Sequence, residues 1–453
     1  MRSTTGLVRW AVSVPLLAAW PALVFAGAVT ASPDAPLSPA DVLRLAASAS
    51  AAAVEAAADS QAAAAAVRRA QAWWWPTVSA AGSYTVQDHA QEVAAGPLLF
   101  PMGEKEFGQY QVQAREILWA GGRRPAAVRA ARHGLEATRQ QGRFAVQQAQ
   151  VGALQAYVQA VALGQRLRVL DRRLAALREH ARVVQDLFEH GLVARNDLLE
   201  VQVRADQVAD ARAALADKRR VALADLNRRL GRDPAASLAV PDSLPLPPAP
   251  ADSLDALLAA AACDNAGLRA ALAAEAAAGE QVRVVDRGKW PVLLATATHA
   301  WQENDVLVYP HVNSVAVALS WDLFDGGVRR ADLREARARL AAARRARLEA
   351  GRAALVALRD AWTDWTRARR EEATARRNAA AAAENLRIVE DQYRHGAARG
   401  SDVLDAEALL AESRFQQVDK HNDAYMALAR LGVAAGKDLC EMFGNQRDGS
   451  VTP

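Results

Sequence analysis

Histidine and aspartate recur in two short segments of this 453-residue chain, 205 positions apart. His190-Gly191 in the first segment matches His395-Gly396 in the second, and Asp197 matches Asp402. Imidazole and carboxylate groups are common metal ligands, but neither histidine has a nearby cysteine or a convergent pair of carboxylates. Such histidines are more often surface turn residues, so the sequence predicts neither a metal site nor a cofactor.

Other side chains that could perform chemistry are sparse. The eight histidines are scattered, and the two cysteines are Cys263 and Cys440. The sequence contains no HExxH, no Walker A and no Gly-x-Ser-x-Gly motif. A disulfide between the two cysteines is possible but unsupported, and a packed or free thiol is the simpler expectation. The sequence therefore predicts that the protein is not an enzyme.

The two matching segments belong to a larger internal repeat. Gly121-Gly122 matches Gly326-Gly327 at the same offset of 205, whereas Trp75-Pro76 matches Trp290-Pro291 at an offset of 215. The first copy therefore carries ten more residues in one segment, which is expected to be a loop. The chain is two copies of one unit. We expect repeats over residues 40–232 and 251–436, a Pro-rich extended linker over 233–250 and a flexible tail over 437–453.

The amino terminus predicts export. Arg2 and Arg9 precede an apolar stretch that ends near small residues, which is typical of a signal peptide over residues 1–26 with cleavage after Ala26 or Ala31. Without the two arginines, 53 basic residues face 51 acidic ones, a balance that does not point to nucleic acid. No later stretch offers about 18 uncharged apolar residues, so membrane insertion would have to use strands.

Proline is absent between Pro125 and Pro234 and again between Pro310 and Pro453, which predicts long continuous helices. Each unit is expected to open with a helix, over residues 41–74 and 253–288. After each Gly-Gly, a helix of about 65 residues would extend roughly 100 Å. The chain would turn at Gly191 and at Gly396, and a returning helix of about 32 residues would begin near Asn196 or Ser401 as N-cap. The paired helices would form an antiparallel coiled coil.

Between the opening helix and the Gly-Gly, each unit predicts a β-hairpin. Alternating apolar and polar residues after Pro76, before Gly121 and before Trp321 indicate strands, and symmetry places a fourth after Pro291. Strands with one apolar face in an exported protein suit an outer-membrane barrel wall. Four strands are too few to close a barrel, so several chains must share one. Four tryptophans at strand–helix junctions predict an aromatic girdle: Trp75, Trp119, Trp290 and Trp321.

The order of helix, hairpin, Leu323-Phe324-Asp325-Gly326-Gly327, very long helix, glycine turn and returning helix, present twice, resembles the TolC-type outer-membrane efflux protein family. The resemblance implies a mainly α fold with a small β part. Three chains would form a twelve-strand outer-membrane barrel continuous with a periplasmic tunnel of coiled-coil helices. The protein would be the exit duct of a tripartite efflux or type I secretion system, served by a periplasmic adaptor and an inner-membrane pump.

The same resemblance implies site residues near the two turns. Asp402 and Asp405 would ring the periplasmic entrance. Asp197 and Tyr393 would help to hold that entrance shut. The arginine of the family's closing link is displaced by one position, to Arg399, where Ala398 occupies the matching place. Adaptor contacts would fall at the turns, at Gly191, Gly396, His190 and His395. The alternatives are a periplasmic coiled-coil adaptor, which would need additional β-rich domains, and a soluble coiled-coil scaffold.

Overall fold

Two helices of 67 residues each carry the fold, α3 (Arg123–Glu189) and α7 (Val328–Arg394). They are seen in a computed structural model of the protein, which describes residues 36–90, 92–246, 248, 250, 252–303 and 308–444. The predicted signal peptide lies outside these residues. At 1.5 Å per residue, each long helix extends about 100 Å, as the uninterrupted proline-free sequence predicts.

Each long helix is followed by a 35-residue returning helix, α4 (Arg195–Arg229) after α3 and α8 (Gly400–Ala434) after α7. Both turns have the same hydrogen bonds. Gly191 N–H donates to Phe188 O at 2.9 Å, and Gly396 N–H donates to Tyr393 O at 3.0 Å. Both glycines have positive φ, 75° and 72°. This is the Schellman arrangement that favours glycine at a helix end.

The expected N-caps of the returning helices are wrong by two residues. The N-caps are Ala194 and Arg399, and neither makes a side-chain cap to the helix. At the second helix the third residue serves instead, because the Asp402 carboxylate accepts a 2.8 Å hydrogen bond from the Arg399 backbone N–H. A carboxylate at this position also interacts favourably with the helix dipole.

The opening helix of each repeat is divided into two, which the sequence interpretation missed. The first repeat has α1 (Pro39–Ala49) and α2 (Ala51–Ala72); the second has α5 (Leu254–Asp264), α6 (Ala266–Asp286) and the 3-10 turn η1 (Arg287–Lys289). Ser50 Oγ accepts from Ala53 N–H at 3.2 Å, and Asn265 Oδ1 accepts from Leu268 N–H at 3.0 Å. Ser and Asn favour such caps over helix interiors. The two breaks are 215 residues apart, so they belong to the duplicated unit.

One helical stretch among the described residues, Leu254–Lys289, is long and apolar enough to cross a membrane by length and composition. It is the α5–α6 stretch, which Asn265 interrupts. α6 lies against both α3 and α7, and Glu275 on it pairs with Arg347 of α7 at 2.6 Å. These contacts are those of a helix packed within the protein.

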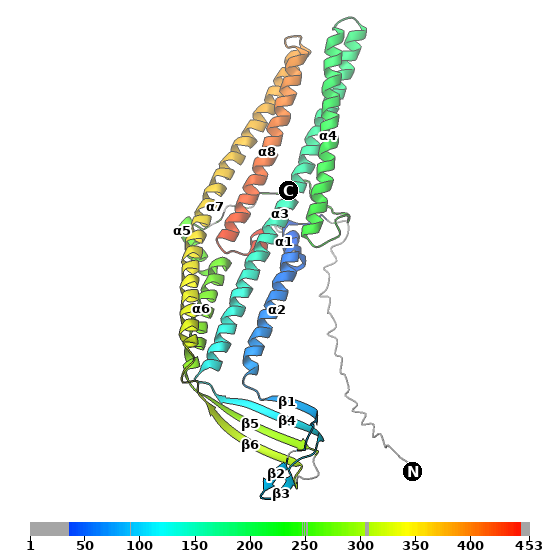
Figure 1. Ribbon diagram of the computed structural model, residues 1–453. Coiled ribbons are helices and arrows are strands. Elements are labelled where there is room, and N and C mark those ends of the chain that lie inside the picture. The colour runs from blue at the N-terminus through cyan, green and yellow to red at the C-terminus, as the bar shows by residue number, and fades with distance from the viewer. Residues whose placement is uncertain are drawn as a thin grey trace, which may run out of the picture. The chain divides into compact units, whose positions relative to one another are not determined.

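The four predicted strands form one antiparallel sheet in the order β1-β4-β5-β6 (Figure 1). The strands are β1 (Thr77–Val86), β4 (Glu106–Trp119), β5 (Val292–Gln302) and β6 (His311–Ser320). β4 and β5 pair with each other, so the two repeats are joined within the sheet. The loop predicted from the ten extra residues also holds a two-stranded ribbon, β2 (Glu92–Ala95) with β3 (Leu98–Pro101). The Gly96-Pro97 turn between them is a signal that the sequence interpretation did not use.

The strand register separates the sheet into a polar and an apolar face. One cross-strand row contains Ser79, Gln113, Thr298 and Ser314. The adjacent row contains Val78, Ala114, Ala297 and Val315. Side chains alternate between faces along a strand, so these two rows lie on opposite faces. The separation is not complete, because the row of Ala80, Val112, His299 and Asn313 lies on the mainly apolar face. On the apolar face Val315 is 82% exposed within the single chain.

The largest apolar core lies where α1, α3, the end of α4 and α8 meet. Tyr157 Oη donates to Leu37 O at 2.7 Å, and the Tyr425 ring packs against Phe443 at 5.2 Å. Part of the linker covers this core, because Leu244 is buried in it and His421 Nε2 contacts Leu244 O at 2.8 Å.

The predicted flexible tail is wrong for residues 439–444. These residues form α9 (Leu439–Gly444), whose Leu439 and Phe443 are buried in the same core. Leu439, Met442 and Phe443 have the spacing of an apolar helix face, so this short segment gains free energy by packing. Residues 445–453 lie outside the described part of the chain.

Candidate functional site

The candidate site is the contact between the two helical hairpins close to their turns. Leu404 and Phe415 of α8 pack into an apolar cluster made mostly by α3 and α4, which includes Leu177, Val184 and Val201. Farther from the turns, Arg166 of α3 forms an ion pair with Asp419 of α8. We call this contact between the two hairpins the seam.

A pocket of about 370 Å³ opens in the seam beside the turns. It brings together three residues that the sequence singled out, Asp197, Tyr393 and Arg399. Two residues that the sequence interpretation missed, His180 and Glu200, also line it. The pocket therefore has a mixed polar and apolar lining, and α3, α4, the end of α7 and the start of α8 border it.

His180 makes an aromatic contact across the seam. Its ring lies edge-on to the Tyr393 ring, with centroids 5.6 Å apart and planes at 64°. The Nε2 atom of His180 is buried without a hydrogen-bond partner among the described residues. Burial lowers the pKa of His180, so its imidazole is neutral at pH 7.

The sequence gives no signal for His180, because it belongs to no repeated motif. Its position opposite Tyr393 depends on how α3 packs against α7 and α8. The displaced Arg399 faces the same pocket but forms no ion pair with Asp197 in the described chain. Asp197 instead accepts a 3.1 Å hydrogen bond from its neighbour, Asn196 Nδ2.

Asp402 and Asp405 are both exposed in the first turns of α8. They are three residues apart, so their carboxylates lie on one side of the helix. Asp402 also caps the helix, as described above. Within one chain these two carboxylates are available to solvent and do not contribute to the seam.

A buried carboxylate lies in the seam one and a half turns beyond Asp402. Glu407 is 7% exposed, and its Oε2 atom has no hydrogen-bond partner among the described residues. Burial raises the pKa of Glu407 to about 7; the nearby Arg173 of α3 opposes this and Glu390 of α7 adds to it. Sequence reasoning missed this group because nothing in the local pattern marks it as buried.

The two turn histidines act as helix caps. Nδ1 of His190 lies 2.8 Å from Asp186 O, and Nδ1 of His395 lies 2.8 Å from Asp391 O. The hydrogen bond to the Asp186 backbone and the Asp186 carboxylate raise the pKa of His190. Both side chains are exposed. No group of three His, Cys, Asp or Glu residues in the described chain is arranged to hold a metal ion.

The glycine pairs form the junctions between strands and long helices. Gly121, Gly122, Gly326 and Gly327 all have positive φ, from 59° to 93°. A Cβ at Gly121 would lie 2.4 Å from Trp290 Cβ, whereas a Cβ at Gly326 would have no neighbour within 4 Å. The two equivalent turns therefore differ, because only the first is tightly packed.

The four predicted girdle tryptophans lie at these junctions and are exposed within the chain, from 44% for Trp119 to 75% for Trp75. Trp119 and Trp290 contact each other edge to face at 6.4 Å, and Trp321 Nε1 donates to Lys289 O at 3.1 Å. All four tryptophans are therefore accessible at the surface of the single chain.

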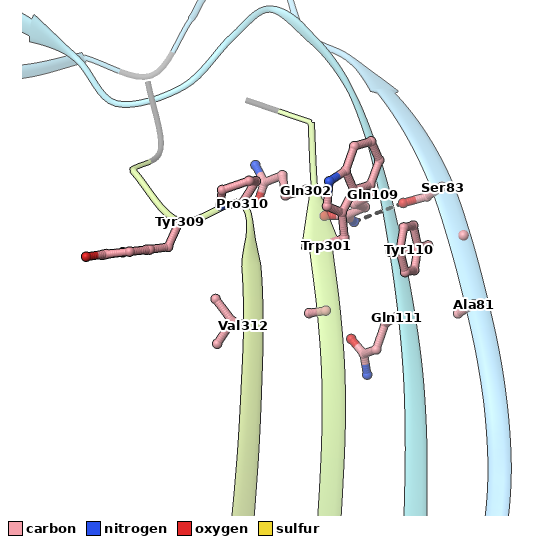
Figure 2. Close-up of a pocket in the computed structure, with 12 residues that line it drawn as sticks. Ala81, Ser83, Gln109, Tyr110, Gln111, Trp301, Gln302, Tyr309, Pro310 and Val312 are labelled. Carbon is pink, nitrogen blue, oxygen red and sulfur yellow. Dashed lines mark hydrogen bonds between the residues drawn. The ribbon is translucent and has the colours of Figure 1, made fainter. Parts of the chain in front are cut away.

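A second group of aromatic residues lies at the far end of the sheet, around a pocket of about 230 Å³ (Figure 2). Tyr110 stacks on Trp301 with centroids 5.2 Å apart, and Tyr309 lies at the edge of the pocket. Gln109 Nε2 donates to Ser83 Oγ at 2.9 Å. A transmembrane barrel has aromatic residues at both membrane boundaries, so a search for a second band could have found this group.

Comparison with known proteins agrees with this geometry. The family model for outer membrane efflux proteins matches residues 42–232 and 257–437, one match for each repeat. The outer membrane efflux protein BepC of Brucella suis biovar 1 (strain 1330) is 25% identical over 345 residues, which cover 75% of this chain and 74% of BepC.

Two solved structures share the fold. The outer membrane protein VceC of Vibrio cholerae has 20% identity and a TM-score of 0.73, covering 88% of this chain and 96% of VceC. A membrane protein of Pseudomonas aeruginosa has 21% identity and a TM-score of 0.74, covering 88% and 93%. The amphipathic sheet and the two long helical hairpins place this chain in a class of outer-membrane channels. The chain belongs to the outer membrane efflux protein family.

Family membership makes the protein an outer-membrane exit duct whose helices project into the periplasm, and it does not favour the adaptor or scaffold alternatives. It also accounts for the open sheet. Strands β1 and β6 each have one unpaired edge in the described chain, and such an edge cannot face hydrocarbon. Three chains supply twelve strands, which close the wall as a trimeric barrel.

Proposed function

We propose that this duct serves a tripartite efflux or type I secretion system, and that the seam between the two hairpins holds its periplasmic mouth shut. The observation that carries the second part is the pocket at the turns, where Tyr393 and Arg399 of one hairpin meet His180 and Asp197 of the other. Opening the mouth requires the hairpins to separate there. Closure then depends on contacts that can be removed one at a time.

The contacts have a strength suited to a gate. An aromatic edge-to-face pair contributes about 0.5–1.5 kcal/mol, so three copies in a trimer would contribute roughly 1.5–4.5 kcal/mol. A free-energy difference of 1.4 kcal/mol changes an equilibrium constant about tenfold. These contacts would therefore shift the equilibrium between open and closed states toward the closed state by roughly tenfold to a thousandfold. An adaptor that binds the open state more tightly than the closed state could reverse this equilibrium.

Single-channel conductance in planar bilayers tests the gate. We expect Tyr393→Ala and Asp197→Ala to increase the conductance or the open fraction, because each removes a group from the contact between hairpins. Tyr393→Phe should have a small effect, because the edge-to-face contact belongs to the ring. Asp210→Ala is the matched control, since Asp210 is exposed on the same helix as Asp197 and does not line the pocket. Conductance unchanged in both alanine variants would remove these residues from the gate.

The positions of the acidic pair, the two turns and the junction tryptophans support a role for each of them. Asp402 and Asp405, exposed on one side of α8, would form an acidic ring at the mouth when three chains meet, and such a ring attracts cations. The turns at Gly191 and Gly396, with their caps His190 and His395, would contact a periplasmic adaptor that is itself coupled to an inner-membrane pump. Trp75, Trp119, Trp290 and Trp321 would lie at the periplasmic boundary of the membrane.

A further inference from the structure

The polar face of the sheet carries one charged residue in the described strands. Its side chains on β4 are Phe107, Gln109, Gln111, Gln113, Arg115 and Ile117, and the matching positions on the other strands are Ser, Thr, Ala, Gln, Leu and Val. The opposite face carries most of the exposed valines and leucines that suit lipid, together with Glu106, Glu116, His299, His311 and Asn313. In a membrane barrel the polar face lines the lumen, so Arg115 projects into the pore.

The charge of Arg115 is not neutralised within the described chain. Its cross-strand neighbours are Thr77 and Thr296, and the hydrogen bond with Thr77 uses the Arg115 carbonyl oxygen, which accepts from Thr77 Oγ1 at 3.2 Å. Its side chain is exposed, and its guanidinium forms no ion pair with any residue that the structure describes. The adjacent Glu116 lies on the other face of the sheet, since consecutive strand residues alternate.

We propose that Arg115 forms a threefold ring of positive charge in the barrel lumen and determines the charge preference of the exit, favouring anionic solutes over cationic ones. The trimer places three copies at one height. Arginine and lysine rings are the usual basis of anion preference in pores. Low-dielectric walls around a water-filled lumen focus the field of such charges. The remainder of the polar face is hydroxyl, amide and apolar, so this ring is its main electrostatic feature.

The ring acts separately from the acidic residues proposed at the mouth. Arg115 lies four residues before the end of β4, which is roughly 14 Å of strand from the junction. Asp402 lies beyond the far end of α7, about 100 Å away along the helix. The Debye length at 0.1 M salt is about 10 Å. Salt therefore screens the two sets of charges from each other, and each acts independently. This proposal rests on the duct being a trimeric barrel and not on the seam acting as a gate.

The test is the reversal potential of the conducting trimer in planar bilayers under a KCl gradient, which gives the ratio of chloride to potassium permeability. We expect Arg115→Gln to lower this ratio by about tenfold near 0.1 M salt, the lower end of the effect of focused charge. Arg115→Glu should lower it further. Both effects should shrink near 1 M salt, where the Debye length is about 3 Å.

Two further variants make the test specific. Thr296→Arg in the Arg115→Gln background restores a charge on the same face at the same height, so it should restore the ratio. Glu116→Gln, which removes a charge from the other face, should leave it unchanged. The same shifts are expected in an Asp402→Asn/Asp405→Asn background, where the mouth acids are neutral.

An unchanged reversal potential in conducting Arg115→Gln and Arg115→Glu trimers would overturn the proposal. So would a failure of Thr296→Arg to restore the ratio while the trimer forms in normal amounts. Absence of conductance from both the wild-type trimer and a Tyr393→Ala trimer, in which the closed seam is weakened, would instead count against the duct itself, which separates the two failures.

Discussion

At the scale of single residues, aromatic rings and not an ion pair between Asp197 and Arg399 connect the two hairpins beside the turns. Arg399 faces the pocket without reaching Asp197, and the contact is made instead by the ring edges of His180 and Tyr393. Beside them, Glu407 is buried without a hydrogen-bond partner for Oε2 among the described residues. Such a group makes the stability of the seam depend on pH.

The sign of that dependence follows from the raised pKa of Glu407. Below the ordinary value of 4.5 the carboxyl is neutral both in the folded protein and after unfolding, so it has no pH effect. Between pH 4.5 and about 7 the unfolded chain releases the proton while the folded protein keeps it. Folding stability therefore falls as pH rises through this window and is constant above it.

We expect Glu407→Gln to raise the thermal unfolding temperature of the trimer at pH 8 and to change it little at pH 4, because glutamine cannot ionise. Melting temperatures in detergent at both pH values measure this. Glu412→Gln is the control, since Glu412 is exposed on the same helix. An equal shift at both pH values would mean that ionisation of Glu407 is not the cause.

At the scale of elements, the two repeats share a plan but differ in packing. Both opening helices break at a capping residue, and both strand–helix junctions use two glycines in the left-handed region. The first junction packs tightly against Trp290 of the second repeat, whereas Gly326 has open space around it. The two junctions therefore share the same backbone conformation because of the duplication. They differ in how tightly they are packed, because only the first contacts the other repeat.

This difference predicts unequal effects of the same substitution. Gly121→Ala and Gly326→Ala should each cost about 1–2 kcal/mol per protomer for the left-handed backbone. Gly121→Ala should cost more, because its Cβ would overlap Trp290 Cβ at 2.4 Å. Unfolding of the purified trimers would compare the two variants. Equal loss of stability would show that the Trp290 contact relaxes without cost.

At the scale of the whole molecule, the two faces of the sheet contact different environments, lipid on one side and the water-filled lumen on the other. One face carries most of the exposed valines, leucines and aromatic residues with a few polar ones, and the other carries hydroxyls, amides, aliphatic side chains and Arg115. Neighbouring copies must pair with the edges of β1 and β6, because the described sheet is open. Insertion into lipid and assembly of the trimer therefore depend on the same four strands.

Adjacent positions on β6 separate these two environments. Val315→Lys places a charge on the lipid face near the middle of the strand, which should cost about 2–4 kcal/mol per chain. Ser314→Lys places the same charge in the lumen and should cost little. The amount of heat-modifiable trimer in the outer-membrane fraction measures the difference. Equal recovery of both variants would contradict the assignment of faces.

The sequence by itself determined the duplication, the four strands, the long helices and their glycine turns. These features depend on local chemistry: proline removes helix hydrogen bonds, glycine permits positive φ, and alternation assigns the faces of a strand. The same reasoning missed the breaks at Ser50 and Asn265, because a single capping residue inside an alanine-rich helix is a weak signal.

Only the tertiary structure decided which residues meet. His180 opposite Tyr393, the burial of Glu407, the packing of α9 into the core and the close approach of Gly121 to Trp290 all join segments far apart in the chain. A periodic pattern gives the side of a helix or strand on which a residue lies. It does not give the rotation and offset at which two helices pack, and a shift of one residue would replace each of these partners.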